Sequence, residues 1–258
     1  MRPAQSHFAN VANQYASFRP TYAPELLQAL VALTGHQAYP APIVALDIAA
    51  GSGQATVPLA EYAQTVIASD LALNQIASMP YHPRIHRYVA RAELSGLPDY
   101  SVDLITVAQS MHWFDVDAFH HEVYRILKPN GLIAVWTYAL LSGTPELTDI
   151  IHRLYNYTAA WWPADRAHVD NHYANLAFPY QRIDFIPPPM VMHYTLEQLL
   201  GYLRTWSGVQ RYLKDQGHDP VALFVDAFTA AWPISPTTPT LFTFDLTIFV
   251  GNPHPQKQ

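Results

Sequence analysis

The residues with the clearest chemical pattern follow the first apolar run of the chain. Asp47 ends that run, and Gly51 and Gly53 form a tight Gly-x-Gly turn directly after it. A second acid, Asp70, closes the next apolar run. Small residues let a backbone come close to a ligand, and an acid in this place can accept hydrogen bonds from both hydroxyls of a ribose. The spacing therefore predicts a nucleoside-binding site.

The residues of the same turn distinguish between two possible cofactors. A dinucleotide fingerprint needs glycine or alanine three residues after the second glycine, and a helix N-terminus aimed at a pyrophosphate. Thr56 occupies that position, and the carboxylate of Asp47 would repel a pyrophosphate. The pattern favours a ligand with a cationic amino-acid tail, such as S-adenosylmethionine, over NAD. An ordinary strand-to-helix turn is the structural alternative.

Strands and helices alternate between residues 43 and 138. Apolar runs predict strands at 43–48, 65–70, 85–90, 102–108 and 132–136. Helical patterns predict crossovers at 53–62 and 72–79 and a third helix capped by Asp115. Such an alternation is typical of a parallel sheet with right-handed crossovers. We expect an α/β fold, a Rossmann-like doubly wound and mostly parallel seven-stranded sheet, with a partly helical cap inserted in the C-terminal half.

The alternation breaks after residue 138, which suggests three parts. Residues 1–138 would form a lid helix and the cofactor-binding core. Residues 139–239 would form a cap that binds the substrate, with a possible sheet strand near 181–194. Within the cap, Thr195 and Gln198 fit a capping box before a helix. Residues 240–258 would form the last strand and a tail.

Composition narrows the possible functions. The 258 residues include 14 Lys and Arg against 20 Asp and Glu, a formal net charge of −6, which argues against a nucleic-acid surface. The absence of cysteine excludes disulfides and thiolate chemistry. The 13 histidines are scattered, so we expect no bound metal. No apolar run has the length of a membrane span. We expect a soluble cytoplasmic protein, a monomer or homodimer, with a small molecule as its partner.

Several short pieces occur in a specific order along most of the chain. They are FRPTY at 18–22, LDIAAGSGQ at 46–54, ASD at 68–70, AE at 92–93, LP at 97–98, MHWFD at 111–115, LKPNG at 127–131, TWSG at 205–208 and RY at 211–212. Together they resemble the class I S-adenosylmethionine-dependent methyltransferases, and within these the type 11 group that includes trans-aconitate methyltransferases. One departure is Ala49, where the family usually has glycine. Its Cβ would narrow the space beside the methionine tail.

The resemblance implies a set of cofactor-binding residues: Tyr15, Arg19, Asp47, Ala49, Gly51, Gly53, Asp70, Leu71, Ala92, Glu93 and Gln109. Asp47 would orient the turn and the ammonium group of the cofactor. Leu71 would pack on the adenine, which Ala92 and Glu93 would line. The structural alternatives are a helix N-cap for Asp70 and a solvated loop acid for Glu93.

Two further groups of residues would belong to a lid and a substrate site. Tyr15 and Arg19 would close over the methionine tail or bind a carboxylate, with helix packing and a surface charge as their alternatives. Residues expected near the acceptor are His112, Trp113, Trp206, Ser207, Arg211 and Tyr212. Trp113 would face the sulfonium. His112 would serve as general base, unless it only packs and shapes its loop. A surface arginine on an amphipathic helix is the alternative for Arg211.

We therefore predict methyl transfer from S-adenosylmethionine to a small molecule, with a carboxylate or hydroxyl oxygen as the favoured acceptor. A carboxylate acceptor would need no base, whereas a hydroxyl or phenol would need His112. Two alternatives stay open. One is a non-methylating relative that binds S-adenosylmethionine or S-adenosylhomocysteine structurally or for other chemistry, and the less favoured one is an NAD-dependent oxidoreductase.

Overall fold

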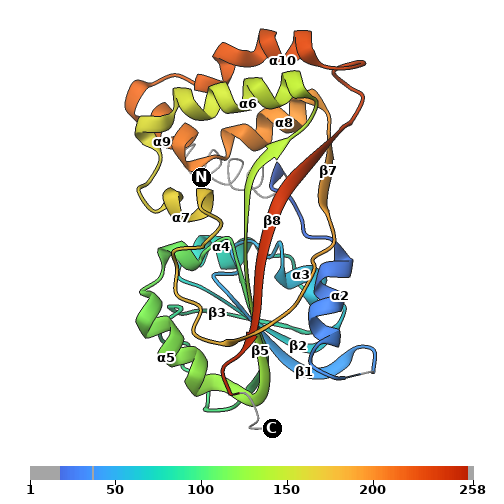
Figure 1. Ribbon diagram of the computed structural model, residues 1–258, viewed down its shortest axis with the longest axis vertical. Coiled ribbons are helices and arrows are strands. Elements are labelled where there is room, and N and C mark those ends of the chain that lie inside the picture. The colour runs from blue at the N-terminus through green and yellow to red at the C-terminus, as the bar shows by residue number, and fades with distance from the viewer. Residues whose placement is uncertain (1–17, 37, 255–258) are drawn as a thin grey trace, which may run out of the picture. The chain divides into compact units, whose positions relative to one another are not determined.

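The computed structural model describes residues 18–36 and 38–254. The chain divides into two compact units, each built from several segments (Figure 1). The sheet unit comprises Thr21–Tyr138, Ala167–Pro188 and Leu246–Gln258. The helical unit comprises Met1–Pro20, Ala139–Arg166 and Pro189–Asp245. Two long strands, β5 and β8, contribute residues to both units.

The central sheet has the strand order β3-β2-β1-β4-β5-β8-β6. Its strands are β1 Ala41–Ile48, β2 Ala63–Asp70, β3 Ile85–Val89, β4 Val102–Ala108, β5 Leu127–Ser142, β6 Gln181–Ile183 and β8 Thr240–Asn252. The pairs among β1 to β5 are parallel, and β6 runs antiparallel to β8. This arrangement confirms the predicted Rossmann-like α/β fold. An additional strand, β7 Met190–Tyr194, pairs with the first part of β8.

Helices lie on both faces of this sheet. They are α2 Pro24–Ala32, α3 Thr56–Leu59, α4 Leu73–Ser78, α5 Val116–Ile126 and the short α7 Arg166–Asp170. Figure 1 shows α5 on the opposite side of the sheet from α2 and α3. Asp115 caps α5 as expected, because its carboxylate accepts a hydrogen bond from the backbone N–H of Ala118. The apolar side of α5 packs on alternate residues of the strands: Phe119, Val123 and Ile126 meet Leu46, Ile48, Ile105, Val107, Ile133 and Val135.

Two elements differ from their predicted lengths. The first crossover helix was expected over 53–62, but α3 covers only Thr56–Leu59. Residues 60–62 instead form tight turns whose N–H groups bond to the carbonyl three residues back. Strand β5 begins at Leu127 rather than residue 132, because Leu127 pairs with Val102 and the register then shifts. Gly131 permits this irregularity, since a Cβ there would lie 2.7 Å from the side chain of Leu127.

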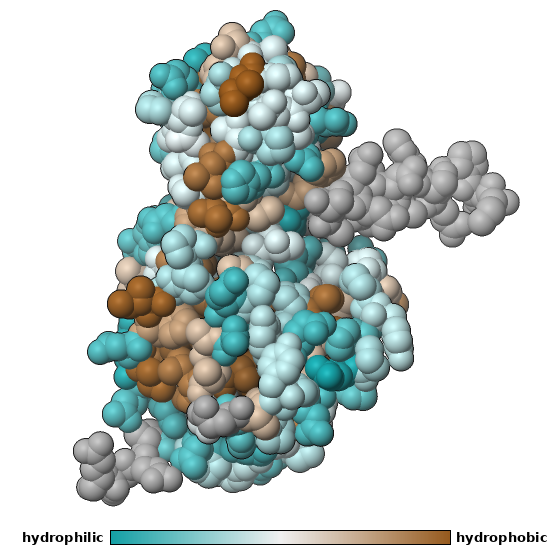
Figure 2. Space-filling view, turned by 90° about the vertical axis from the view of Figure 1, so that its right-hand side faces the viewer, coloured by the Kyte–Doolittle hydropathy of each residue, from teal (hydrophilic) through white to brown (hydrophobic). Residues whose placement is uncertain are grey.

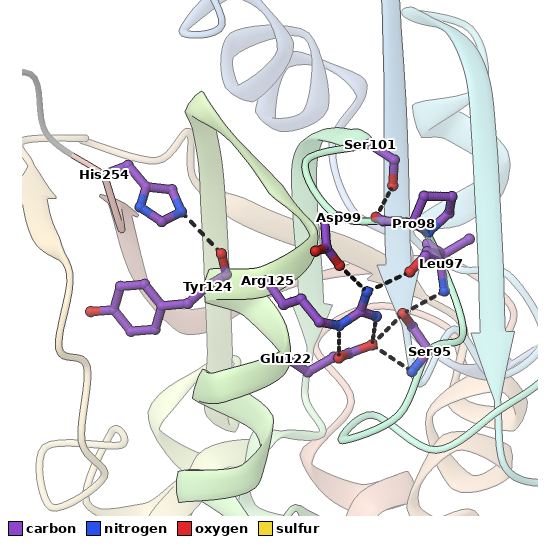
Figure 3. A network of polar contacts seen from close by, with 9 residues as sticks. All are labelled: Ser95, Leu97, Pro98, Asp99, Ser101, Glu122, Tyr124, Arg125 and His254. Atoms are coloured by element: carbon purple, nitrogen blue, oxygen red, sulfur yellow. Dashed lines mark hydrogen bonds and ion pairs between the residues drawn. The ribbon is translucent and has the colours of Figure 1, made fainter.

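The amino ends of β4 and β5 are tied together by a polar network on α5 (Figure 3). The buried carboxylate of Glu122 accepts hydrogen bonds from both the backbone N–H and the hydroxyl of Ser95. Arg125 bonds to that same carboxylate, to Asp99 and to the carbonyl of Leu97. The loop that leads into β4 is thereby fixed to the C-terminal end of α5.

The helical unit is built from α6 Pro145–Tyr157, α8 Leu196–Arg204, α9 Ser207–Gln216 and α10 Val225–Ala231, with two 3₁₀ turns, Ala159–Trp161 and Pro220–Phe224. The predicted capping box is confirmed, because Thr195 and Gln198 each bond to the backbone N–H of the other. Aromatic rings fill the interior of this unit, among them Tyr202 and Trp206.

The face that Figure 2 shows is mostly hydrophilic, with hydrophobic residues gathered in places. Among the described residues, none of the helices is both long and apolar enough to cross a membrane.

Candidate functional site

The turn after β1 is held in an unusual backbone conformation. Ala49, Gly51 and Gly53 have positive φ angles of 55°, 57° and 96°. Glycine adopts this left-handed region readily, whereas a residue with a Cβ pays about 1–2 kcal/mol. Gly53 is also sterically required, because a Cβ there would lie 2.7 Å from the side chain of Met79. The turn thus presents a nearly bare backbone at the carboxyl end of β1.

Asp47 lies beneath this turn and is completely buried. Its two carboxylate oxygens accept hydrogen bonds from the hydroxyls of Thr56, at the start of α3, and Thr106, on β4. Burial raises the pKa of Asp47 from 3.8 to about 6, although both threonine hydrogen bonds lower it. The carboxylate therefore fixes the position of the turn from below.

Asp70 connects the end of β2 to the same turn. One oxygen accepts a hydrogen bond of 2.8 Å from the backbone N–H of Gly51, and the other one of 2.7 Å from that of Ala72. The second bond is an Asx-type turn, and it leads into α4 without capping it, because the N-cap residue is Ala72 and no side chain caps the helix. The alternative of a helix N-cap for Asp70 is therefore wrong. Each carboxylate oxygen has two acceptor sites, so Asp70 retains capacity for a ribose hydroxyl.

Apolar side chains are exposed after the second and third strands. Leu71 follows β2 and is 70% exposed, and Leu94 lies in the loop after β3 and is 69% exposed. In the same loop Ala92 is buried, and Glu93 accepts a hydrogen bond from the backbone N–H of Asp115 and pairs with Arg91. These bonds lower the pKa of Glu93 and outweigh its partial burial. The loop beside Leu94 is thus anchored to the start of α5.

The end of β4 lies beside the β1 turn, because β1 and β4 are paired as far as Ile48 and Val107. Gln109 has a φ of 56°, and its side-chain amide bonds to the hydroxyl of Thr137 and the carbonyl of Tyr138 on β5. The next residue, Ser110, is buried, and among the described residues its hydroxyl has no hydrogen-bond partner. A buried hydroxyl without a protein partner is uncommon, and a water, an ion or a ligand can supply its hydrogen bond.

His112 and Trp113 follow on a 3₁₀ turn, Met111–Trp113. The Nδ1 atom of His112 lies 2.7 Å from the hydroxyl oxygen of Tyr173, which belongs to the segment after α7. The indole of Trp113 is 54% exposed and packs on the imidazole with ring centroids 4.6 Å apart. A histidine, a tyrosine and an exposed indole thus lie together at the carboxyl end of β4.

The remaining predicted residues lie in the helical unit or outside the described residues. Tyr15 is among the residues that are not described. Arg19 is exposed, and its neighbour Phe18 packs against Gly201 on α8. Ser207 and Arg211 are exposed on α9, while Trp206 and Tyr212 are buried; the hydroxyl of Tyr212 bonds to Tyr157 and His218. These residues share one unit, whereas all the other predicted site residues lie in the sheet unit.

Sequence reasoning missed three partners of the predicted residues. Thr56 and Thr106 hold Asp47, and the threonine between the apolar residues Ile105 and Val107 of β4 was the available signal for one of them. Tyr173 holds His112 across 61 positions in a stretch without periodicity, so no local pattern identifies it. No group of three or more potential metal ligands occurs among the residues that the structure describes.

Comparisons with known proteins agree with this geometry. A family model described as a methyltransferase domain matches residues 46–135, from β1 into β5. A Dictyostelium discoideum protein assigned as a methyltransferase is 31% identical over 216 residues, covering 82% of this chain and 81% of the relative. A solved structure from Anaeromyxobacter dehalogenans, described as a type II methyltransferase, is 37% identical with a TM-score of 0.82 and covers 92% of this chain and 99% of its own.

The chain therefore belongs to the class I S-adenosylmethionine-dependent methyltransferases, and S-adenosyl-L-methionine is its cofactor. The residues at the carboxyl edge fit that group. The turn of Ala49, Gly51 and Gly53 offers backbone rather than side chains, Leu71 offers an apolar surface for a base, and the buried hydroxyl of Ser110 has an unmet hydrogen bond. The narrower likeness to trans-aconitate methyltransferases stays a prediction.

Proposed function

We propose that this methyltransferase acts on an oxygen atom of a small molecule that binds at the carboxyl end of β4. One observation supports this most directly: His112 follows β4 immediately, and β4 is paired with the strand that carries the cofactor turn. Ligands of open α/β sheets bind beyond the carboxyl ends of the strands. An oxygen acceptor beside His112 would then lie next to the site where the cofactor is held.

The proposed cofactor site uses the residues of the sheet unit. The backbone at Ala49, Gly51 and Gly53 would face the methionine tail, and Asp70 would accept hydrogen bonds from the ribose. Leu71 would cover one side of the adenine, with the loop of Ala92 and Glu93 at its edge. Gln109 would face the methionine tail from β4. The structure supports these roles because all of the residues lie at one edge of one sheet.

The proposed substrate site contains His112 and Trp113 of the sheet unit. The substrate roles of Trp206, Ser207, Arg211 and Tyr212 and the carboxylate-binding role of Arg19, all in the helical unit, stay predictions from the sequence. When bound, the cofactor supplies an electrophilic methyl group. The protein has to bring the acceptor oxygen close to it and exclude water. Trp113 would shield the site from solvent, and the hydroxyl of Ser110 would donate a hydrogen bond to a ligand oxygen. Trp113 and Ser110 would only position the acceptor and exclude water. A carboxylate acceptor would need no general base in addition.

Titration calorimetry tests the cofactor site first. We expect micromolar binding of S-adenosylmethionine and S-adenosylhomocysteine and none of NAD. Asp70→Ala should weaken binding about a hundredfold, equivalent to about 2.7 kcal/mol, because both the ribose contact and the bond to Gly51 are lost. Asp99→Ala is a matched control, since that carboxylate lies at the opposite end of the sheet. Unchanged affinity in Asp70→Ala would refute the proposed site.

The acceptor is then sought by measuring S-adenosylhomocysteine release with a panel of small carboxylic acids, phenols and aliphatic alcohols. Turnover with at least one oxygen acceptor is the expected result. Turnover only with amines or thiols would refute the proposed oxygen acceptor. Tight binding of the cofactor with no turnover of any acceptor would favour the non-methylating alternative.

A further inference from the structure

Two histidine–tyrosine pairs join the β4–α5 region to the segment that follows α7. Nδ1 of His112 bonds to the hydroxyl of Tyr173, and Nδ1 of His120 bonds to the hydroxyl of Tyr180. All four residues belong to the sheet unit. The pairs are similar in chemistry and in their spacing along the chain, so any difference between them indicates what each one does.

The His120–Tyr180 pair is enclosed. Nε2 of His120 bonds to the carbonyl oxygen of Ala177 at 3.0 Å, so both ring nitrogens are bound inside the protein. Burial lowers the pKa of His120, and it raises the pKa of Tyr180. This pair carries no exposed group that could meet a substrate, and its role is to attach α5 to the segment beside it.

The His112–Tyr173 pair lies at the carboxyl end of β4 instead. His112 is only partly buried, and its ring packs on the exposed indole of Trp113. Tyr173 is almost completely buried, with 1% of its surface exposed. The pair thus consists of a fixed inner tyrosine and an outer histidine on the edge where the proposed acceptor binds.

The backbone that carries Tyr173 is strained. His172 and Tyr173 have consecutive positive φ angles of 52° and 58°. Such a conformation costs about 1–3 kcal/mol for a residue with a side chain. It is maintained by a hydrogen bond from the N–H of Tyr173 to the carbonyl of His168, and by one between Nδ1 of His172 and the hydroxyl of Thr247 on β8. Strain that neighbouring contacts maintain in this way is a recurring feature of functional sites.

We propose that Tyr173 is a positioning residue that prepares His112 to act as a general base, and that the acceptor is therefore a hydroxyl or phenol. This inference rests on the proposed function. In the neutral histidine, Nδ1–H donates to the hydroxyl oxygen of Tyr173, which places the basic lone pair on Nε2. The same bond fixes the ring orientation and stabilises the imidazolium that forms later.

The proton and electron balance of the step is simple. The acceptor O–H bond breaks, and its proton moves to Nε2 of His112. The acceptor oxygen forms a bond to the methyl carbon while the bond between that carbon and the sulfonium sulfur breaks, and the sulfur keeps the electron pair. The products are a methyl ether, the neutral thioether S-adenosylhomocysteine and an imidazolium, which returns its proton to solvent.

The test is nuclear magnetic resonance of the full-length protein with ¹⁵N-labelled histidine, without cofactor and at a pH where imidazoles are neutral. The wild-type protein should show His112 protonated on Nδ1, with the signal assigned by its loss in His112→Gln. In Tyr173→Phe the signal should change toward protonation on Nε2. Tyr180→Phe is the matched control, and it should change the signal of His120 while His112 keeps its tautomer.

Activity gives the second readout. With a hydroxyl acceptor, His112→Gln should lose about a hundredfold or more in kcat, as for removal of a general base. Tyr173→Phe should lose about tenfold or more in kcat with KM and cofactor affinity little changed, as when a catalytic group loses its productive orientation. Tyr180→Phe should retain its kcat. If Tyr173→Phe does not fold, Thr247→Val removes the bond to His172 and should alter the same His112 signal.

The inference is overturned if Tyr173→Phe leaves both the His112 tautomer and kcat unchanged, or if turnover is found only with carboxylates and His112→Gln retains it. Failure of the proposed function is a different observation, because it would appear as absent cofactor binding in the wild-type protein. The tautomer measurement needs no cofactor or acceptor, so it tests the pair in either case.

Discussion

The two ends of the central sheet differ in how their polar groups are hydrogen-bonded. At the amino ends of β4 and β5, Glu122, Arg125 and Ser95 satisfy one another within a closed network (Figure 3). At the carboxyl ends, Ala49 is held in a left-handed conformation and the hydroxyl of Ser110 is buried without a partner among the described residues. The difference teaches that the polar side chains at the amino end bond to one another, while the carboxyl end retains a buried hydroxyl that a ligand can hydrogen-bond.

The largest effect on stability is expected from the amino end. Glu122→Ala would leave the N–H and hydroxyl of Ser95 and the guanidinium of Arg125 short of a partner. Each of the two Ser95 donors would cost about 1–3 kcal/mol when left buried without an acceptor, and Arg125, whose side chain is 36% exposed, would add less. We expect a loss of that order in the free energy of unfolding, measured by urea denaturation, with unchanged affinity for S-adenosylmethionine.

Asp99→Ala is the control for that change. Asp99 bonds to the same guanidinium but is well exposed, so its removal should cost no more than about 1 kcal/mol. A large loss of cofactor affinity in Glu122→Ala, measured at a temperature where the variant is folded, would contradict the proposed separation between the two ends.

An intermediate effect on stability is expected from Asp47, the buried acid beneath the turn that follows β1. The pKa of Asp47 is about 6 in the folded protein against 3.8 when it is exposed, so between these pH values the folded chain binds more protons than the unfolded chain. Stability should therefore fall as the pH rises from about 4 to about 6, by at most roughly 3 kcal/mol. Asp47→Asn should remove this slope and be more stable at pH 7. Urea denaturation of both proteins at several pH values measures the difference.

The affinity of Asp47→Asn for S-adenosylmethionine gives a second test of the role of Asp47. If the charge of Asp47 holds the turn for a cationic tail, Asp47→Asn should bind S-adenosylmethionine more weakly although it unfolds less easily. A variant that is stabilised and binds the cofactor equally well would show that the buried charge has no role at the carboxyl end. A slope that persists in Asp47→Asn would assign the pH dependence to another group.

The smallest effect on stability is expected at Ala49, where the family usually has glycine. Ala49→Gly should relieve the left-handed strain, and the greater backbone entropy of glycine in the unfolded chain should offset part of the gain. We expect a net stabilisation of about 1 kcal/mol or less, seen as a small rise in Tm, together with tighter cofactor binding. Ala50→Gly is the control, because Ala50 is buried and lacks a positive φ. It should destabilise the protein, and an equal response of both variants would contradict the strain argument.

The parts of the fold that follow from local patterns could be predicted from the sequence. Alternating apolar runs and crossovers identified the parallel strands, and the Asp115 and Thr195 caps were visible as short motifs. The acid–glycine spacing around Asp47 and Gly51 predicted a tight turn after β1, which the structure confirms; its role in binding the cofactor stays a prediction. These features depend on residues close together in the chain, which is why one sequence suffices for them.

Other features depend on contacts that no local pattern encodes. The left-handed conformation of Ala49 is imposed by the turn and is unexpected for alanine. The bond between His112 and Tyr173 spans 61 positions, and Tyr173 lies in a stretch without helical or strand periodicity. The early start of β5 depends on pairing between Val102 and Leu127. The roles of the proposed site residues stay predictions until the variants are measured.

The hydrogen bonds to Asp47, beneath the turn that follows β1, also constrain how this sequence can evolve. Asp47, Thr56 and Thr106 come from β1, α3 and β4, and each threonine hydroxyl donates a hydrogen bond to one oxygen of the buried Asp47 carboxylate. A single apolar substitution would leave a buried polar group unbonded at a cost of about 1–3 kcal/mol, whereas joint apolar replacement can be nearly neutral. Apolar residues therefore cannot replace these three positions one at a time without weakened intermediates. Descendants of this chain should therefore keep the trio together or lose it together.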